Sequence, residues 1–381
     1  MPAPDAALSA APPAAPHKYE FIDSLRGLAI LGVLLVHVAR YAGGTLAGRP
    51  ALAALLGNGA RGVQLFFVVS AFTLFLSMNT RHDEERRPTL NFFLRRFFRV
   101  APLYYLAILY YGALVPVHPS ARFSLSEYAA NLTFTNGLNP YYINHLVPGG
   151  WSITVEFFFY AILPWLFLRV RTLSHAVVLL VLAVLLNTAC TSLLAHFPLI
   201  AEAGVWWNFL FFYFPNQLPV FACGIVLYFL VRAPQRVLPG GTLLLSAYAL
   251  LASLATDTAS AATGWPYLPR HLWFGFGFVL LGWGLSRKAS WVLVNPVTRF
   301  VGRISFSLYL VHFAVLDVFD RCKPAAVIAS GGLLPGLINV GVGFAVVAGV
   351  SSALAWVLYH LVEVPGQNMG RHVIARLEGT A

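Results

Sequence analysis

Apolar runs long enough to cross a lipid bilayer recur along almost the whole chain. A hydrocarbon core of about 30 Å requires about 20 helical residues, and hydrophobic residues make up 59% of the 381 residues, against 10% charged. In lipid, a helix bonds all its backbone groups internally, whereas a membrane barrel would show shorter, alternating segments. The predicted fold class is therefore all-α: a polytopic integral membrane protein with one helix bundle around a central cavity.

Ten segments are predicted to cross the membrane. They cover residues 25–45, 61–79, 100–117, 151–169, 175–194, 207–231, 241–256, 271–286, 304–320 and 335–362. The sixth is interrupted by Pro215 and Pro219, and proline breaks helices. The predicted domain division is a disordered cytoplasmic tail over residues 1–20, a membrane domain over 21–365 and a short cytoplasmic tail over 366–381.

The net charge of +11 is distributed in a way that argues against a nucleic-acid partner. With the N-terminus in the cytoplasm, 18 of the 25 Lys and Arg residues fall on the cytoplasmic side and the other 7 on the outer side. Basic residues concentrate on cytoplasmic loops, so both termini are predicted to be cytoplasmic, with membrane lipids around the bundle. The sequence leaves open whether the protein is a monomer or a homo-oligomer.

The first span carries a cation and an imidazole. Arg26 and His37 are eleven positions apart, which returns them to within about 20° of one helix face, roughly 16 Å apart along the axis. Lipid is a poor environment for both, so this face is predicted to line a cavity. The alternative is that Arg26 reaches the headgroups and His37 bonds a neighbouring helix.

Three arginines precede the third span, at positions 95, 96 and 99. The three-residue step from Arg96 to Arg99 places two guanidinium groups on adjacent turns of one face, and such groups suit phosphate. Arg95, Arg96 and Arg99 are therefore candidates for binding a phosphorylated donor. Attraction to anionic lipid is the alternative explanation for a basic helix beside the membrane.

The fourth span contains a carboxylate. Glu156 lies inside it, while Trp151 and Ser152 lie near its outer end. An intramembrane carboxylate requires a partner or a function. With a stacking aromatic ring and a hydroxyl nearby, Glu156 could orient a sugar-like acceptor or hold a protonated imidazole. A structural hydrogen bond between helices is the alternative.

A second cation and imidazole occur in "VGRISFSLYLVHF". Arg303 and His312 are nine residues apart, which in one continuous helix places them on opposite faces. His312 is therefore expected to be packed or to support the site indirectly, as are Asp23 and Tyr309. The scattered Cys190, Cys223 and Cys322 have no metal-ligand spacing, so no metal is expected.

Several motifs, in this order along the chain, resemble the acyltransferase family 3 of membrane proteins. A basic residue, ten residues and a histidine match Arg26 and His37. "GVQLFFVVSAF" is similar to the second-span motif, with Ala71 where the family usually has Gly. "RRFFRVAPLYY" resembles the Arg-x-x-Arg element at Arg96 and Arg99, "WSITVEFFFY" the Ser-x-x-x-Glu element, and "GRISFSLYLVH" and "LVEVP" the closing motifs.

The resemblance implies an O-acyltransferase of the bacterial inner membrane. The donor would be acetyl-CoA, or another acyl-CoA, from the cytoplasm, and the acceptor a carbohydrate hydroxyl of a polysaccharide, an O-antigen or a lipid-linked sugar. His37 would deprotonate the acceptor and Arg26 would position the donor. Arg96 and Arg99 would bind the phosphates of coenzyme A, while Glu156, Ser152 and Trp151 would orient the acceptor.

Other functions remain open at this stage. The acceptor could instead be a small metabolite or a lipid. A proton-coupled transporter, in which His37 and Glu156 relay protons, is the alternative from another class. The sequence also leaves open direct transfer or a transient acyl-enzyme.

Overall fold

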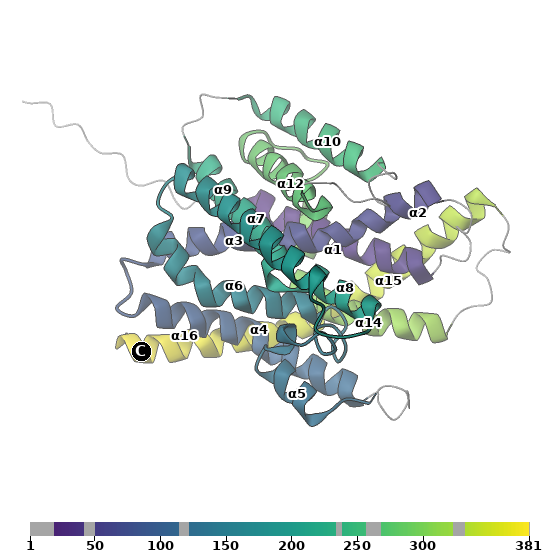
Figure 1. Ribbon diagram of the computed structural model, residues 1–381, viewed down its shortest axis with the longest axis horizontal. Helices are drawn as coiled ribbons and strands as arrows, with labels where there is room; N and C mark the ends of the chain where they lie inside the picture. The colour runs from purple at the N-terminus through teal and green to yellow at the C-terminus, as the bar shows by residue number, and fades with distance from the viewer. Residues whose placement is uncertain are drawn as a thin grey trace, which may run out of the picture.

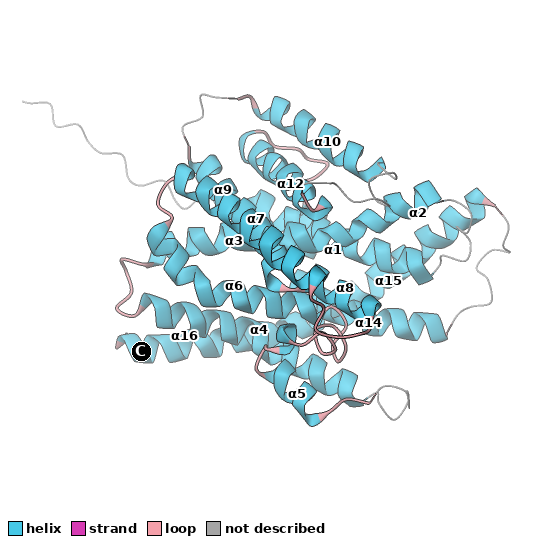
Figure 2. Cartoon of the chain, viewed as in Figure 1, coloured by secondary structure: helices cyan, strands magenta, loops and turns pink. Residues whose placement is uncertain are grey.

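The computed structural model describes residues 19–41, 50–113, 122–233, 238–256, 268–322 and 332–380. Every regular element in these ranges is helical (Figure 2). The elements are α1 (Glu20–Tyr41), α2 (Pro50–Gly57), η2 (Asn58–Arg61), α3 (Gly62–Arg81), α4 (Pro88–Ala113), α5 (Leu125–Leu132), η3 (Asn136–Leu138), α6 (Gly150–Arg169), α7 (Leu173–His196), α8 (Ala203–Phe212), α9 (Phe214–Arg232), α10 (Gly240–Thr256), α12 (Arg270–Arg287), α13 (Pro296–Arg303), α14 (Ser305–Arg321), α15 (Leu333–Leu358), η4 (Tyr359–Glu363) and α16 (Val364–Glu378).

The all-helical class is confirmed, and each predicted span contains a helix. Within the described ranges, six helices are long and apolar enough to cross a membrane, or seven if the bent pair α13 and α14 forms one span. These criteria do not establish the predicted count of ten; α10, with 17 residues, is one helix that falls short in length. Residues 1–18, 42–45, 114–117 and 381 of the predicted tails and spans lie outside the described residues.

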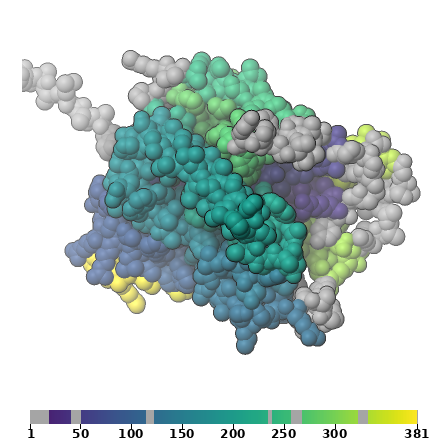
Figure 3. Space-filling view, viewed as in Figure 1, coloured from purple at the N-terminus to yellow at the C-terminus, as the bar shows by residue number. Residues whose placement is uncertain are grey.

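The helices pack as one bundle (Figure 1), with α1 and α3 in its interior. α1 contacts α3, α13, α14 and α15, whereas α7 runs over the surface (Figure 3). Only 11% of the apolar stretch of α7 is buried within the protein. A helix that is apolar all round and exposed on most of its surface suits a lipid-facing position.

Two chain breaks shape the bundle. The sixth predicted span is broken at Tyr213 between α8 and α9, where its prolines indicated an interruption. The chain also bends by 79° between α13 and α14. The prediction that Arg303 and His312 lie on opposite faces of one helix is therefore wrong, because Arg303 ends α13 and His312 belongs to α14.

Glycines allow α1 to approach its neighbours closely. A Cβ atom on Gly302 of α13 would lie 1.7 Å from the carbonyl oxygen of Asp23, and one on Gly27 would lie 2.1 Å from that of Thr298. The second-span motif has Ala71 where the family usually has Gly, and the glycine of this contact lies on the neighbouring helix instead. A Cβ atom on Gly224 of α9 would lie 2.7 Å from the Cβ atom of Ala71. Small residues in these positions bring helix backbones together in membrane proteins.

The chain closes with α16 lying beside α4 (Figure 1). The carboxylate of Glu378 accepts hydrogen bonds from the backbone N–H groups of Arg86, at 2.9 Å, and Arg87, at 3.1 Å. It also accepts one from Nδ2 of Asn91, at 2.7 Å. The end of α16 therefore caps the beginning of α4, the helix that carries the arginine motif.

Candidate functional site

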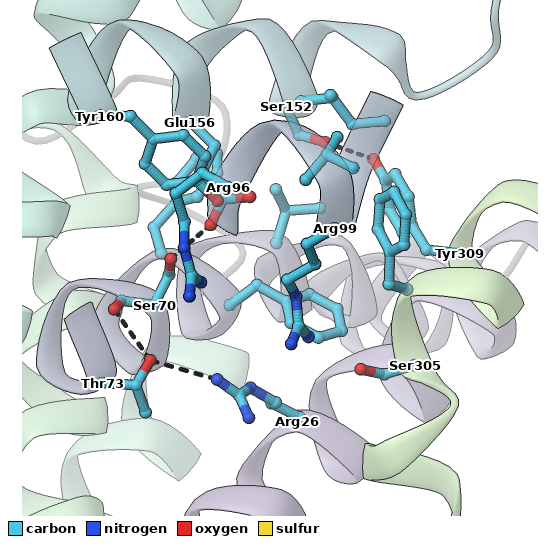
Figure 4. A pocket seen from close by; sticks show the side chains of 16 residues that line it. Arg26, Ser70, Thr73, Arg96, Arg99, Ser152, Glu156, Tyr160, Ser305 and Tyr309 are labelled. Carbon is cyan, nitrogen blue, oxygen red and sulfur yellow. Dashed lines mark hydrogen bonds between the residues drawn. The ribbon is translucent and has the colours of Figure 1, made fainter. Parts of the chain in front are cut away.

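A cavity of about 760 Å³, partly open to solvent, lies between α1, α3, α4, α6 and α14 (Figure 4). Its apolar lining residues are Val63, Phe66, Phe67, Val100, Ile153 and Phe306. Its polar lining residues are Arg26, Ser70, Thr73, Arg96, Arg99, Ser152, Glu156, Tyr160, Ser305 and Tyr309. Six of the eleven site residues predicted from the sequence therefore line this cavity: Arg26, Arg96, Arg99, Ser152, Glu156 and Tyr309.

Three guanidinium groups point into this cavity (Figure 4). Arg26 donates a hydrogen bond to Thr73 at 3.1 Å and lies 3.5 Å from the carboxylate of Asp23. Arg96 and Arg99 have no hydrogen-bond or ion-pair partner within the described part of the chain, and the Nε atom of Arg96 is buried. Clustered cations with unused donors favour an anionic ligand, and guanidinium groups bind phosphate particularly well.

A carboxylate faces the arginines across the cavity. Ser70 of α3 donates a hydrogen bond to Glu156 of α6, and Tyr160, one turn further along α6, lines the same cavity. The sequence analysis did not select Ser70 or Tyr160. The four-residue spacing of Glu156 and Tyr160, which places both on one helix face, was a usable signal for Tyr160.

The far end of the cavity is closed by a hydrogen-bonded triangle. The hydroxyl of Tyr309 donates to the carbonyl oxygen of Gly149 at 3.0 Å, and Ser152 lies 2.9 Å from the Tyr309 hydroxyl (Figure 4). Gly149 has a positive φ of 79°, and a Cβ atom there would lie 2.8 Å from that hydroxyl. Glycine is therefore required at the N-terminus of α6 both for its backbone conformation and for its small size.

His37 does not line the cavity. Its ring centre lies 5.4 Å from that of His312, and the ring centre of His312 lies 5.7 Å from that of Tyr309. The two histidines thus lie behind the triangle, one on α1 and one on α14. The prediction that this face of α1 lines a cavity therefore holds for Arg26 and is wrong for His37, which lies beyond the far end of the cavity.

Glu363 is a further carboxylate near the arginines; it is fully buried and was not predicted from the sequence. It lies in the π-helical turn η4, accepts a hydrogen bond from Ser307 at 2.9 Å and interacts electrostatically with Arg99 and Arg26. Single π-turns are frequent at functional sites. The rule that singled out Glu156, a carboxylate inside an apolar run, would also have found Glu363 in "YHLVEVP".

Two selected residues point away from the cavity. Arg95 forms a bidentate ion pair with Glu85, with Nη1–Oε1 and Nη2–Oε2 distances of 2.6 and 3.1 Å. Trp151 is buried against aromatic rings, its centre 4.5 Å from that of Phe212 in a stacked arrangement. In the described residues, no group of three or more His, Cys, Asp and Glu side chains could hold a metal ion.

Comparison with known proteins supports the motif assignment. The sequence model of a family described as "Acyltransferase domain" matches residues 19–360. The exopolysaccharide production protein ExoZ of Rhizobium meliloti (strain 1021) is 31% identical over 108 residues, which is 27% of this chain. That match spans 33% of the relative's own length. No solved structure matches. The chain, from α1 to the π-helical turn, belongs to the acyltransferase family 3.

Proposed function

We propose that this protein is an O-acyltransferase of the bacterial inner membrane. It transfers an acyl group, acetyl in the simplest case, from cytoplasmic acyl-CoA to a hydroxyl of a cell-surface carbohydrate. Family membership supplies the reaction class. The name of the relative supports an exopolysaccharide or its lipid-linked precursor as the acceptor.

The observation that carries the proposal is the convergence of three arginines in a cavity between the helices. Arg96 and Arg99 from α4 and Arg26 from α1 supply unused donors to one space, as the several phosphates of coenzyme A require. Glu156 and Glu363 balance part of this charge. The donor's phosphates would enter among the arginines, with the pantetheine arm pointing along the cavity towards Tyr309.

In this proposal the reaction takes place at the far end of the cavity, where the hydrogen-bonded triangle of Tyr309, Ser152 and Gly149 must open to expose His37. His37 removes the proton of the acceptor hydroxyl as its oxygen attacks the thioester carbonyl carbon. The carbon–sulfur bond then breaks, and the imidazolium of His37 returns the proton to the departing thiolate of coenzyme A. Ser152 and Glu156 contribute hydrogen-bonding groups along the path of the acceptor, and Trp151 holds α6 against its aromatic neighbours.

This reaction requires access from both sides of the membrane. In the proposed topology, both termini are cytoplasmic and residues 21–365 form the membrane domain. Arg96 and Arg99 face the cytoplasmic donor, whereas Gly149 and Ser152 begin α6 on the outer side, where the acceptor arrives. We favour direct transfer between donor and acceptor over a transient acyl-enzyme because it needs fewer steps.

The test uses the full chain in lipid nanodiscs with acetyl-labelled acetyl-CoA and a lipid-linked saccharide extract. We expect label in the saccharide fraction. His37→Ala should reduce transfer by about 10²-fold or more with donor affinity retained, and Arg96→Gln should raise the KM for the donor about tenfold, as loss of ~1.4 kcal/mol would. Arg371→Gln, on the exposed face of α16, is the matched control.

Two outcomes would overturn the proposal. Equal transfer by wild type and folded His37→Ala would remove His37 from the chemistry. Absence of donor binding, together with proton-coupled solute uptake into proteoliposomes, would instead identify a transporter.

A further inference from the structure

His312 has a fixed proton arrangement. Its side chain is completely buried, and its Nδ1 atom lies 2.7 Å from the carbonyl oxygen of Tyr309, one turn earlier in α14. A carbonyl oxygen can only accept, so Nδ1 must carry the hydrogen. The neutral ring then has a proton-free Nε2 atom, which can only accept a hydrogen bond.

This Nε2 atom is buried and has no hydrogen-bond partner within the described ranges. Leaving a buried acceptor unsatisfied is unfavourable, because the atom has lost its hydrogen bonds to water. Buried polar atoms without partners are uncommon in folded proteins and call for an explanation. A nearby donor that engages Nε2 during the reaction would supply one.

Three rings surround His312. Phe313 has no polar hydrogen, and the hydroxyl of Tyr309 already donates to Gly149 at 3.0 Å. The third ring is the imidazole of His37, 5.4 Å away between centres. A ring nitrogen lies about 1.1 Å from its ring centre and a hydrogen bond joins atoms about 2.9 Å apart, so hydrogen-bonded imidazoles have centres about 5 Å apart. The observed centre distance of 5.4 Å is close to this value, so an N–H group of His37 is within reach of Nε2 of His312.

We infer that His312 is a positioning residue for His37, within the function proposed above. The Tyr309 carbonyl fixes the tautomer of His312, and Nε2 of His312 accepts one N–H of His37. The other nitrogen of His37 is then proton-free and can take the proton of the acceptor hydroxyl. His312 keeps its own proton throughout, and it stabilises the imidazolium of His37 until the thiolate takes the proton back.

Two amide substitutions separate the two ends of the ring. In His312→Asn, the side-chain amide can still donate to the Tyr309 carbonyl, but nothing replaces Nε2. In His312→Gln, the side chain reaches the position of Nε2 and offers an acceptor oxygen. His372→Asn is the matched control, because His372 is exposed on α16 and its Nδ1 atom also contacts a backbone carbonyl, that of Asn368, at 2.8 Å.

We expect His312→Asn to lower kcat about 10²-fold or more, with the KM for the acyl donor changed less than about twofold. His312→Gln should have a kcat at least about tenfold higher than that of His312→Asn, since it restores a hydrogen-bond acceptor. Because His312 acts through His37, adding His312→Asn to His37→Ala should cause no further loss. A rise in KM alone, equal activity of Asn and Gln variants, or additive losses in the double variant would each overturn the inference.

A spectroscopic test is independent of turnover. In protein labelled with ¹⁵N-histidine and assigned by comparison with the His312→Asn variant, we expect His312 to be protonated at Nδ1 and to accept at Nε2. A proton on Nε2 overturns the inference even if the enzyme is active. If wild type transfers no acyl group while His312 shows the expected tautomer bonded to His37, the proposed function fails but the histidine pair stands.

Discussion

Arg26 of α1 donates a hydrogen bond from Nη2 to Oγ1 of Thr73 of α3 across 3.1 Å, although 47 positions separate the two residues. The hydroxyl hydrogen of Thr73 is used within its own helix, towards the carbonyl oxygens of Val69 and Ser70. Its oxygen is therefore left to accept from Arg26. This contact and the ion pair of Nη1 with Asp23 at 3.5 Å together hold the guanidinium group in the cavity.

We expect Thr73→Val to weaken donor binding with little effect on folding. The substitution keeps the side-chain shape but removes the acceptor, and hydrogen bonds to charged groups contribute about 1.5–3 kcal/mol when buried. Because the Arg26 side chain is 24% exposed, we expect a smaller effect, a rise of about 3–10-fold in the KM for acyl-CoA.

Steady-state kinetics in nanodiscs would measure this change. Thr80→Val is the control, because Thr80 lies on the same helix but bonds only to its own helix carbonyls. An unchanged KM in Thr73→Val would show that this contact does not position Arg26 for the donor.

The crossing of α1 and α13 should be intolerant of any side chain at Gly302. In Gly302→Ala, the added carbon would lie 1.7 Å from the carbonyl oxygen of Asp23, so the helices must separate. We expect a loss of at least about 3 kcal/mol or failure to assemble, measured by thermal unfolding and by the yield of monodisperse protein. Gly341→Ala, which meets no atom within 4 Å, should behave as wild type. Normal stability of Gly302→Ala would contradict the crossing.

The ion pair between Arg95 and Glu85 should contribute to stability. Both side chains are 15% exposed, and their shortest distance is 2.6 Å. Removing one partner leaves the other charge poorly solvated, so we expect Glu85→Gln to destabilise the protein by about 1–3 kcal/mol. Differential scanning fluorimetry would measure the shift, with the exposed Glu84→Gln as control. Equal melting temperatures for the two variants would refute this role.

The segment that contains α5 should make the stability pH-dependent through Glu127. Burial raises the pKa of this carboxyl above its usual 4.5, against the opposing effect of His145, whose Nδ1 lies 2.9 Å away. Because the pKa is raised in the folded state, the contribution of Glu127 to the free energy of unfolding is complete below pH 4.5. It is lost as the pH rises through the pKa of the folded state. Glu127→Gln should therefore gain melting temperature relative to wild type as the pH rises from 4.5.

Glu202 provides a comparison of opposite sign. The hydroxyl of Tyr141 donates to it at 2.7 Å and lowers its pKa, so its contribution is present above 4.5 and is lost as the pH falls through the lowered value. Glu202→Gln should be less stable than wild type at neutral pH and equal to it in acid. If the melting temperatures of both variants, relative to wild type, change in the same direction as the pH rises, the assignment for Glu127 is wrong.

Local patterns in the sequence were sufficient to predict the helices and to predict which side chains share a face of one helix. The three-residue step from Arg96 to Arg99 and the eleven-residue step from Arg26 to His37 follow from helix geometry alone. The motifs identified the family because their order along the chain is itself sequence information. Helix arithmetic failed at His312 because the bend between α13 and α14 interrupts the repeat.

Contacts between helices were decided only by the tertiary structure. Arg95 is adjacent to Arg96 in the sequence, yet a turn of about 100° per residue directs it to Glu85 and away from the cavity.

The sequence by itself determined that the apolar runs form helices, since lipid leaves backbone groups no hydrogen-bond partners outside the protein. The order of its motifs identified the protein as a membrane acyltransferase. The tertiary structure decided that Thr73 holds Arg26, that Glu363 joins the site and that His37 lies beside His312. These pairings depend on how closely helices pack at a few glycines and where the chain bends, and no repeat within a single helix encodes such distances.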